Sequence, residues 1–147
     1  MNKKAVYDRI VEIGIVPVIR ASTPAEARLA ARAVSQGGIP IVEITMTCPG
    51  ALEVIAELAK SSGSELLVGA GTVLNAETAR RCIDAGAQFL VSPGLDLPTI
   101  AQAVREGTLI AAGALTPTEV IAAYNAGSDF VRFFPAGRWV AQNTLKR

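Results

Sequence analysis

Residues 66–91 read LLVGAGTVLNAETARRCIDAGAQFLV, and this stretch contains one complete strand–helix–strand unit. Two short apolar runs flank a segment with helical spacing: Leu66–Ala70, Ala76–Ala85 and Gln88–Val91. Asn75 is a typical N-cap for the helix, and Gly86 follows it where a left-handed C-cap belongs. Because the apolar runs are nearly continuous instead of alternating, they predict parallel strands that are buried on both faces.

The same alternation runs along the chain on both sides of this unit. The further apolar runs are Ile15–Ile19, Pro40–Thr45, Leu109–Ala112 and Phe130–Phe134. The further helical segments are Lys3–Ile13, Pro24–Gln36, Gly50–Lys60, Leu97–Glu106 and Pro117–Ala126. Hydroxyl residues precede first-turn prolines at Thr23-Pro24 and Thr116-Pro117, as at capped helix starts. Strict alternation of this kind predicts an α/β fold with a parallel sheet and right-handed crossovers.

Strand spacing leaves two architectures open, an open doubly wound sheet and a (β/α)₈ TIM barrel. A complete barrel needs two more strands and about three more helices, roughly 50–60 further residues on the usual size of that fold. The chain is therefore an open six-stranded sheet or a barrel cut short. After Pro135 the tail reads AGRWVAQNTLKR, which contains no clear next strand.

Composition narrows the function. The 147 residues carry 14 Lys+Arg, 13 Asp+Glu and no His, which gives a net charge of +1. Without a basic excess we expect no nucleic-acid or anionic-membrane partner, and without His there is no His triad or His-ligated metal. Half of the residues are hydrophobic, which suits one folded domain.

The two cysteines, Cys48 and Cys82, lie 34 residues apart without a CxxC pattern. We expect two buried thiols in a reducing compartment instead of a disulfide or a metal site. The N-terminus shows neither a signal peptide nor an 18-residue apolar span, so the expected location is the cytoplasm, with no membrane association.

Two charges interrupt otherwise apolar strands and are the first candidates for a site. They are Glu43 within Ile41–Thr45 and Arg132 within Phe130–Phe134, and Arg20 ends the first strand. Functional groups of parallel α/β folds gather at the C-terminal ends of strands. A buried charge is costly unless it is paired or functional. The charges therefore form either a structural ion pair or a catalytic carboxylate with cationic groups that bind an anionic substrate.

Gly69-Ala-Gly-Thr72 is part of a dinucleotide-binding pattern, but Leu74 replaces its third glycine and no phosphate-binding lysine follows. The better interpretation is a sharp turn at a strand end, with the Thr72 hydroxyl offered toward the site.

Five segments together resemble the 2-keto-3-deoxy-6-phosphogluconate (KDPG) and 4-hydroxy-2-oxoglutarate (KHG) aldolase family. In family order and at family spacing they are GIVPVIR at 14–20, GGIPIVEIT at 37–45, VGAGTVL at 68–74, AGAQFLVSPG at 85–94 and FVRFFPA at 130–136. The resemblance implies a (β/α)₈ barrel with an N-terminal helix, assembled as a homotrimer, and a lyase of Entner–Doudoroff carbohydrate metabolism that needs no metal or other cofactor. It implies cleavage of KDPG to pyruvate and glyceraldehyde 3-phosphate, or of KHG to pyruvate and glyoxylate.

The resemblance also assigns roles to residues. A strand-six lysine of the family forms a Schiff base with the substrate ketone, and the protonated imine accepts the electrons of the broken C3–C4 bond. Glu43 matches the general acid/base, and Thr72 matches a threonine at the pyruvate end. Arg20 matches an arginine that holds the substrate carboxylate in some members, whereas Met46 stands where other members place it. Pro93 and Phe134 match residues that line the pocket.

The chain departs from the family at the Schiff-base lysine, which aligns with Arg132. A guanidinium stays charged and cannot act as a neutral amine nucleophile, so we expect Schiff-base chemistry to fail. The other lysines are Lys3, Lys4, Lys60 and Lys146, and none falls on a strand that faces the site.

The second departure is length, because strands seven and eight, which carry the family's phosphate-binding loops, have no counterpart. We therefore expect an incomplete barrel over residues 1–136 and a divergent tail over residues 137–147. Arg138–Asn143 can be written in codons whose shifted frame encodes Val-Gly-Gly-Ala-Lys, a family-like stretch, which suggests a frameshifted copy.

Two other functions remain open at this point. Glu43 could enolise a carbonyl compound while Arg20 and Arg132 bind its carboxylate or phosphate, with no Schiff base. Alternatively, the chain is a pseudoenzyme that binds a 2-keto acid without turning it over. The expected partner is in each case a small molecule, a 2-keto acid for the aldolase.

Overall fold

The computed structural model describes residues 1–135, and in this part of the chain six helices alternate with six strands. The helices are α1 (Lys3–Ile13), α2 (Pro24–Gln36), α3 (Ala51–Ser62), α4 (Ala76–Asp84), α5 (Leu97–Arg105) and α6 (Pro117–Asn125). The strands are β1 (Val18–Ile19), β2 (Ile41–Thr45), β3 (Leu67–Gly71), β4 (Phe89–Val91), β5 (Leu109–Ala114) and β6 (Phe130–Phe133). The predicted alternation is confirmed.

All neighbouring strands pair in parallel, and their order in the sheet is β1-β2-β3-β4-β5-β6. In a doubly wound sheet the order of the strands reverses at an inner strand, whereas the strands of a barrel wall follow one another in chain order. The observed order is therefore that of a barrel wall. Within residues 1–135, β1 and β6 each pair on one side only. The structure therefore shows a barrel wall that is open between β1 and β6.

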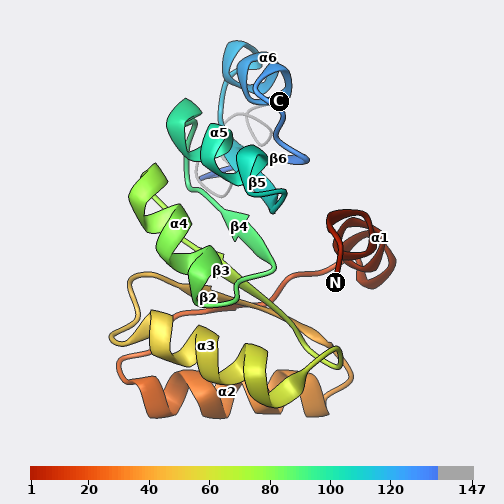
Figure 1. Cartoon of the computed structure of the whole chain (residues 1–147), viewed down its shortest axis with the longest axis vertical. Coiled ribbons are helices and arrows are strands. Elements are labelled where there is room, and N and C mark those ends of the chain that lie inside the picture. The colour runs from red at the N-terminus through yellow and green to blue at the C-terminus, as the bar shows by residue number, and fades with distance from the viewer. Residues whose placement is uncertain (136–147) are drawn as a thin grey trace, which may run out of the picture.

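Alternate residues of each strand enter two separate hydrophobic clusters, as the two-residue period of a strand requires. The outer cluster joins Val42, Val68, Leu90 and Ile110 to the apolar faces of α2–α6. The inner cluster joins Ile41, Leu67, Phe89, Val91 and Leu109 to Val6 of α1. Figure 1 shows the result, with α2 to α6 following one face of the curved sheet and α1 standing apart on the other side.

Helix ends follow the local sequence signals. The Asn75 side chain accepts a hydrogen bond from the Thr78 backbone N–H at 2.8 Å. Thr116 and Glu119 form a reciprocal capping box ahead of α6, with Pro117 in its first turn. Gly86, just after α4, has φ of 98°, which glycine adopts without a steric penalty. The predicted caps at these positions are confirmed.

The first strand is shorter than the sequence predicts. The apolar run Ile15–Ile19 predicts a five-residue strand, but only Val18–Ile19 pairs with β2, and Ile15 is exposed. Pro17 has no backbone N–H to donate, so the ladder cannot extend evenly toward Ile15. The helix predicted at Gly50–Lys60 begins one residue later and ends two residues later in the structure, at Ala51–Ser62.

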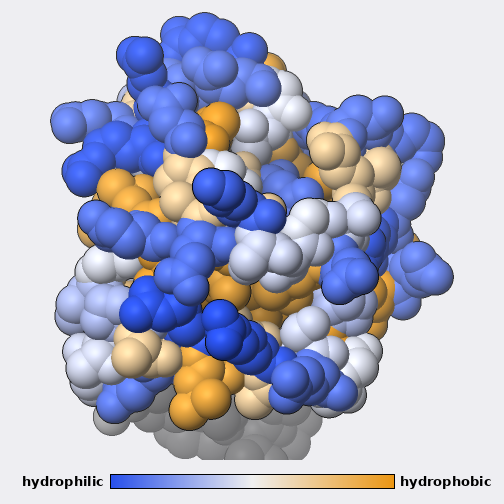
Figure 2. Space-filling model, turned by 60° about the horizontal axis from the view of Figure 1, so that its bottom comes forward, coloured by the Kyte–Doolittle hydropathy of each residue, from blue (hydrophilic) through white to orange (hydrophobic). Residues whose placement is uncertain are grey.

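Charged and polar side chains dominate the helical surface that Figure 2 brings forward, with apolar patches between them. None of the described helices combines the length and apolarity needed to cross a bilayer. Cys48 and Cys82 are both buried and free, as predicted, and burial raises the pKa of the Cys82 thiol to about 11.

Candidate functional site

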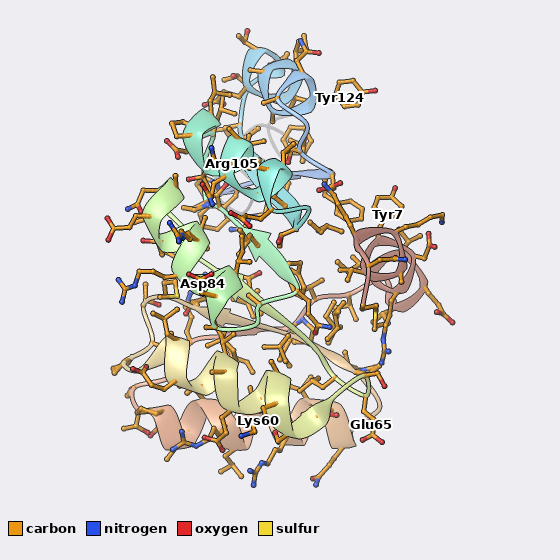
Figure 3. The ribbon with its side chains drawn as sticks, viewed as in Figure 1. Tyr7, Lys60, Glu65, Asp84, Arg105 and Tyr124 are labelled. Atoms are coloured by element: carbon orange, nitrogen blue, oxygen red, sulfur yellow. The ribbon has the colours of Figure 1, made fainter. Side chains whose placement is uncertain are left out.

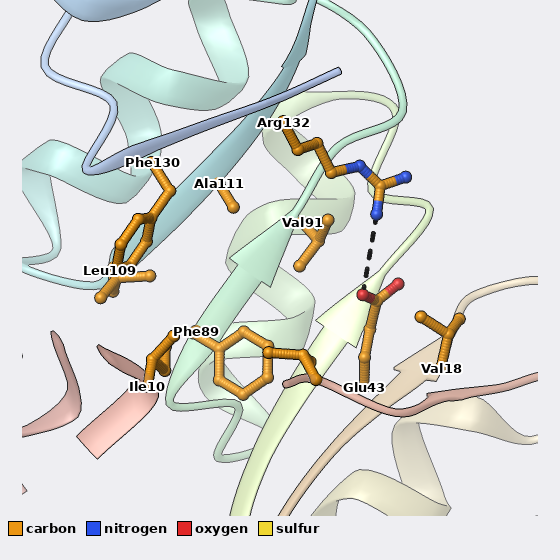
Figure 4. Close-up of a pocket in the computed structure, with 10 residues that line it drawn as sticks. Ile10, Val18, Glu43, Phe89, Val91, Leu109, Ala111, Phe130 and Arg132 are labelled. Carbon is orange, nitrogen blue, oxygen red and sulfur yellow. Dashed lines mark ion pairs between the residues drawn. The ribbon is translucent and has the colours of Figure 1, made fainter. Parts of the chain in front are cut away.

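The structure brings Glu43 and Arg132 together inside the barrel wall. Glu43 lies in the middle of β2 and Arg132 in β6, and both occupy inward-facing strand positions. Nη1 of Arg132 is 3.8 Å from Oε2 of Glu43, as the dashed line in Figure 4 marks. The Glu43 side chain is 3% exposed and the Arg132 side chain 28% exposed. The ion pair considered from the sequence therefore forms, and its carboxylate is the more deeply buried partner.

The Glu43 carboxyl lies directly against the backbone of β3. A Cβ atom at Gly71 would lie 1.8 Å from Oε1 of Glu43, so only glycine leaves room for the carboxyl at this position. Burial raises the pKa of Glu43 above its ordinary value of 4.5, and the charges of Arg132 and Arg20 offset part of this rise. A carboxyl with a raised pKa accepts and returns a proton more readily near neutral pH, which suits a general acid/base.

The Arg132 guanidinium contacts an aromatic ring, and some of its hydrogen-bond donors have no partner among residues 1–135. Its guanidinium carbon lies 4.6 Å from the centre of the Phe134 ring, a cation–π contact. Its Nε is buried and has no hydrogen-bond partner among residues 1–135. The distance to Glu43 is longer than a hydrogen bond, so part of the donor capacity of this guanidinium is unused.

A cavity of about 260 Å³ extends from this ion pair into the barrel interior. Its other lining residues are all apolar: Ile10, Val16, Val18, Phe89, Val91, Leu109, Ala111 and Phe130. Figure 4 shows the two charged side chains on one side of the cavity and the Ile10, Leu109 and Phe130 side chains on the other, with the Phe89 ring beside Glu43. The cavity thus has one polar end and a long apolar wall.

The remaining candidates lie around this centre at the strand ends. Arg20 is exposed and lines a hollow between β1 and α2, and its charge still acts on Glu43. Thr72 has φ of 57° and shares a hollow with Met46 and Asn75. Pro93 lines a third hollow, beside Asp96. The structure therefore joins Glu43, Arg132 and Phe134 by contact, with Arg20 acting through its charge, while Thr72 and Pro93 face neighbouring hollows.

Two features of the site were not found from the sequence. The sequence predicts Phe89 and Leu109 only as residues of buried strands, although the two-residue period of a strand marks both as inward-facing. The role of Gly71 depends on the register that pairs Thr45 with Gly71, and residue identity alone does not give that register.

The described lysines lie away from the cavity. Lys3 pairs with Asp129 at 3.0 Å, and Lys4 pairs with Asp8 at 2.6 Å. Lys60 is exposed on α3, at the outer side of the molecule in Figure 3. Lys146 lies outside the described residues, as does the whole of the divergent tail, residues 137–147. In residues 1–135 no cluster of His, Cys, Asp and Glu is arranged to hold a metal ion.

Known proteins match both the sequence and the fold. The KHG/KDPG aldolase of Escherichia coli strain K12 is 36% identical over 137 residues, which are 92% of this chain and 63% of that protein. A crystal structure of the 2-keto-3-deoxy-6-phosphogluconate aldolase of Zymomonas mobilis ZM4 with 3-phosphoglycerate superposes with a TM-score of 0.82 at 31% identity, covering 97% of this chain and 68% of that one.

A third relative was solved with a trapped reaction intermediate. KDPG aldolase from Legionella pneumophila, with pyruvate captured as a covalent carbinolamine, has a TM-score of 0.75 at 27% identity, over 82% of this chain and 58% of that one. These neighbours confirm the barrel family for the open wall described above. The chain spans less than two thirds of the length of the curated relatives that it matches.

The family model for KDPG and KHG aldolases matches residues 6–146, almost the whole sequence. With the parallel wall, the inward-facing Glu43 and relatives above 30% identity, this match shows that the chain belongs to the KDPG and KHG aldolase family.

Proposed function

We propose that this chain derives from an aldolase that cleaves KDPG to pyruvate and glyceraldehyde 3-phosphate, or KHG to pyruvate and glyoxylate, and that Arg132 blocks the covalent step. The observation that carries the proposal is the contact between Arg132 and Glu43 at the polar end of the cavity. A homotrimer in the cytoplasm, acting in the Entner–Doudoroff route, belongs to the same proposal.

Glu43 suits the proton transfers of such a cleavage. When the C3–C4 bond breaks, its electron pair passes to the protonated imine and the C4 hydroxyl loses a proton as the aldehyde forms. A nearby carboxylate has to take that proton and a protonated carboxyl has to return one to C3. The raised pKa of Glu43 and its nearly complete burial support this role.

Arg132 explains why we expect the covalent step to fail. The amine that attacks the ketone must be neutral, and loss of water then gives the imine. A guanidinium keeps its charge at any physiological pH and offers no such amine. Each of the described lysines lies outside the cavity, so none of them replaces it.

The remaining candidates have supporting roles in the proposal. Arg20 holds the substrate carboxylate, Thr72 contacts the pyruvate end, and Pro93 and Phe134 border the bound substrate. The phosphate of KDPG would bind to parts of the barrel that this chain does not match, since the relatives are longer by a third or more.

Pyruvate release tests the proposal. The chain is completed by fusing it, after Pro135, to the remaining part of the Escherichia coli relative, and Arg132→Lys is compared with the unchanged fusion. We expect the lysine variant to release pyruvate from KDPG or KHG at least about a hundredfold faster, because only it has a nucleophile. Arg80→Lys, on the surface of α4, is the matched control and should change nothing. A folded Arg132→Lys fusion without activity would refute the role assigned to this position.

A further inference from the structure

We infer that the Arg132 end of the cavity binds, without a covalent bond, 2-oxo acids whose side chain is apolar. The carboxylate would pair with Arg132 and the apolar side chain would lie along the cavity wall. The inference rests on the proposed function for the 2-oxo acid group only. The preference for an apolar ligand side chain follows from the lining of the cavity. A phosphorylated sugar acid would need a different, polar lining.

Arg132 has hydrogen-bond donors that the described residues leave without a partner. Its Nε is buried without a partner in the described part of the chain, and its Nη1 is 3.8 Å from Glu43, too far for a hydrogen bond. Guanidinium groups bind carboxylates through two parallel N–H donors, and because Nε is buried, a ligand carboxylate would use the two terminal Nη groups. The Phe134 ring lies against the guanidinium, and the Arg132 side chain remains 28% exposed.

Apart from Glu43 and Arg132, the cavity is small and lined by apolar side chains. Its volume of about 260 Å³ is just below the range of drug-sized pockets, which suits a ligand of small size. Val91 and Ala111 line it between the ion pair and its far side, where Leu109 and Phe130 lie, and none of these side chains is polar. A hydroxylated or phosphorylated ligand chain would lose its bound water here and find no hydrogen-bond partner in the wall. Burial of an aliphatic or aromatic side chain is instead favourable in free energy.

Glu43 competes with the ligand for Arg132. A carboxylate that approaches the guanidinium meets the charge of Glu43 nearby, and like charges repel at this distance. Removal of that charge should therefore strengthen ligand binding, although it removes a partner of Arg132. Nonspecific attraction would respond to the loss of any positive charge, so loss of binding at Arg132 but not at the surface residue Arg80 identifies a specific site.

Calorimetric titration of the full chain tests the inference with three probes: 4-methyl-2-oxopentanoate, pyruvate and the uncharged 4-methylpentan-2-one. We expect the first to bind at least about tenfold more tightly than pyruvate, since three further carbons are buried, and more tightly than the ketone. Arg132→Gln should weaken the binding of both acids about tenfold or more, whereas Glu43→Gln should tighten it severalfold. Arg80→Gln is the matched surface control and should leave all affinities unchanged.

A second variant acts on the apolar wall and leaves the ion pair intact. Ala111→Leu fills part of the cavity, so it should weaken the binding of 4-methyl-2-oxopentanoate and leave the affinity for pyruvate unchanged. Equal affinity for the two acids, or binding that survives Arg132→Gln in a folded variant, would overturn the inference. Because no Schiff base is involved, these results are independent of pyruvate release by the Arg132→Lys fusion, and either proposal can fail alone.

Discussion

Gly71 determines where the Glu43 carboxyl can lie. The carboxyl occupies the space that a side chain at Gly71 would need, and the two residues belong to neighbouring strands. Glu43 and Arg132 could be chosen from the sequence because a charge within an apolar strand is conspicuous. Gly71 could not be chosen from the sequence, because glycine occurs at strand ends for many reasons. Its contact with Glu43 depends on how far the Glu43 side chain reaches across the sheet.

Gly71→Ala should displace the Glu43 carboxyl toward the cavity. Overpacking of this kind costs about 1–3 kcal/mol of unfolding free energy, measurable by urea denaturation. Greater hydration should also lower the pKa of Glu43 toward 4.5, which carbon-13 NMR of the carboxyl can follow.

Because the folded-state pKa is raised, Glu43 stabilises the fold below pH 4.5, and this contribution is lost as the pH rises through its folded-state pKa.

Gly94→Ala is the matched control for this substitution, since a Cβ there meets nothing within 4 Å and no positive φ is involved. The double variant Gly71→Ala with Glu43→Asp should recover part of the lost stability, because aspartate is one methylene shorter. An unchanged Glu43 pKa in Gly71→Ala would contradict the role assigned to Gly71.

At the scale of the elements, capping residues fix where helices begin, and this is why most of their boundaries could be predicted. Side-chain caps act within a few residues, so the sequence contains the whole signal at Asn75 and Thr116. Strand limits depend on a partner strand as well. The run Ile15–Ile19 looks like one strand, but Pro17 and the pairing with β2 reduce it to Val18–Ile19.

Thr116→Ala tests the cap of α6. The Thr116 hydroxyl accepts from the Glu119 backbone N–H, and the Glu119 carboxylate accepts from the Thr116 backbone N–H at 2.9 Å. We expect a loss of about 0.5–2 kcal/mol in unfolding free energy, the usual cost of removing such a cap. Thr118→Ala, two residues further into the helix, should be neutral or slightly stabilising. Equal losses in both variants would show that the capping box contributes nothing.

At the scale of the whole molecule, the decisive property is the order of the strands. Spacing along the chain fits an open sheet as well as a barrel, because neither choice changes the length of a strand–helix unit. The sequential order β1 to β6 and the relatives with TM-scores up to 0.82 identify a barrel wall. The cavity could not be predicted either, since it lies between α1 and strands that are distant in sequence.

Borohydride trapping with pyruvate, read by intact mass, tests most directly the claim that Arg132 silences covalent chemistry in this chain. The unchanged chain and Arg132→Lys are treated side by side, with Arg80→Lys as the control for a lysine placed elsewhere. We expect one reduced pyruvate adduct on Arg132→Lys and none on the other two proteins. An adduct on the unchanged chain would show that another lysine forms the Schiff base, and the role assigned to Arg132 would then be wrong.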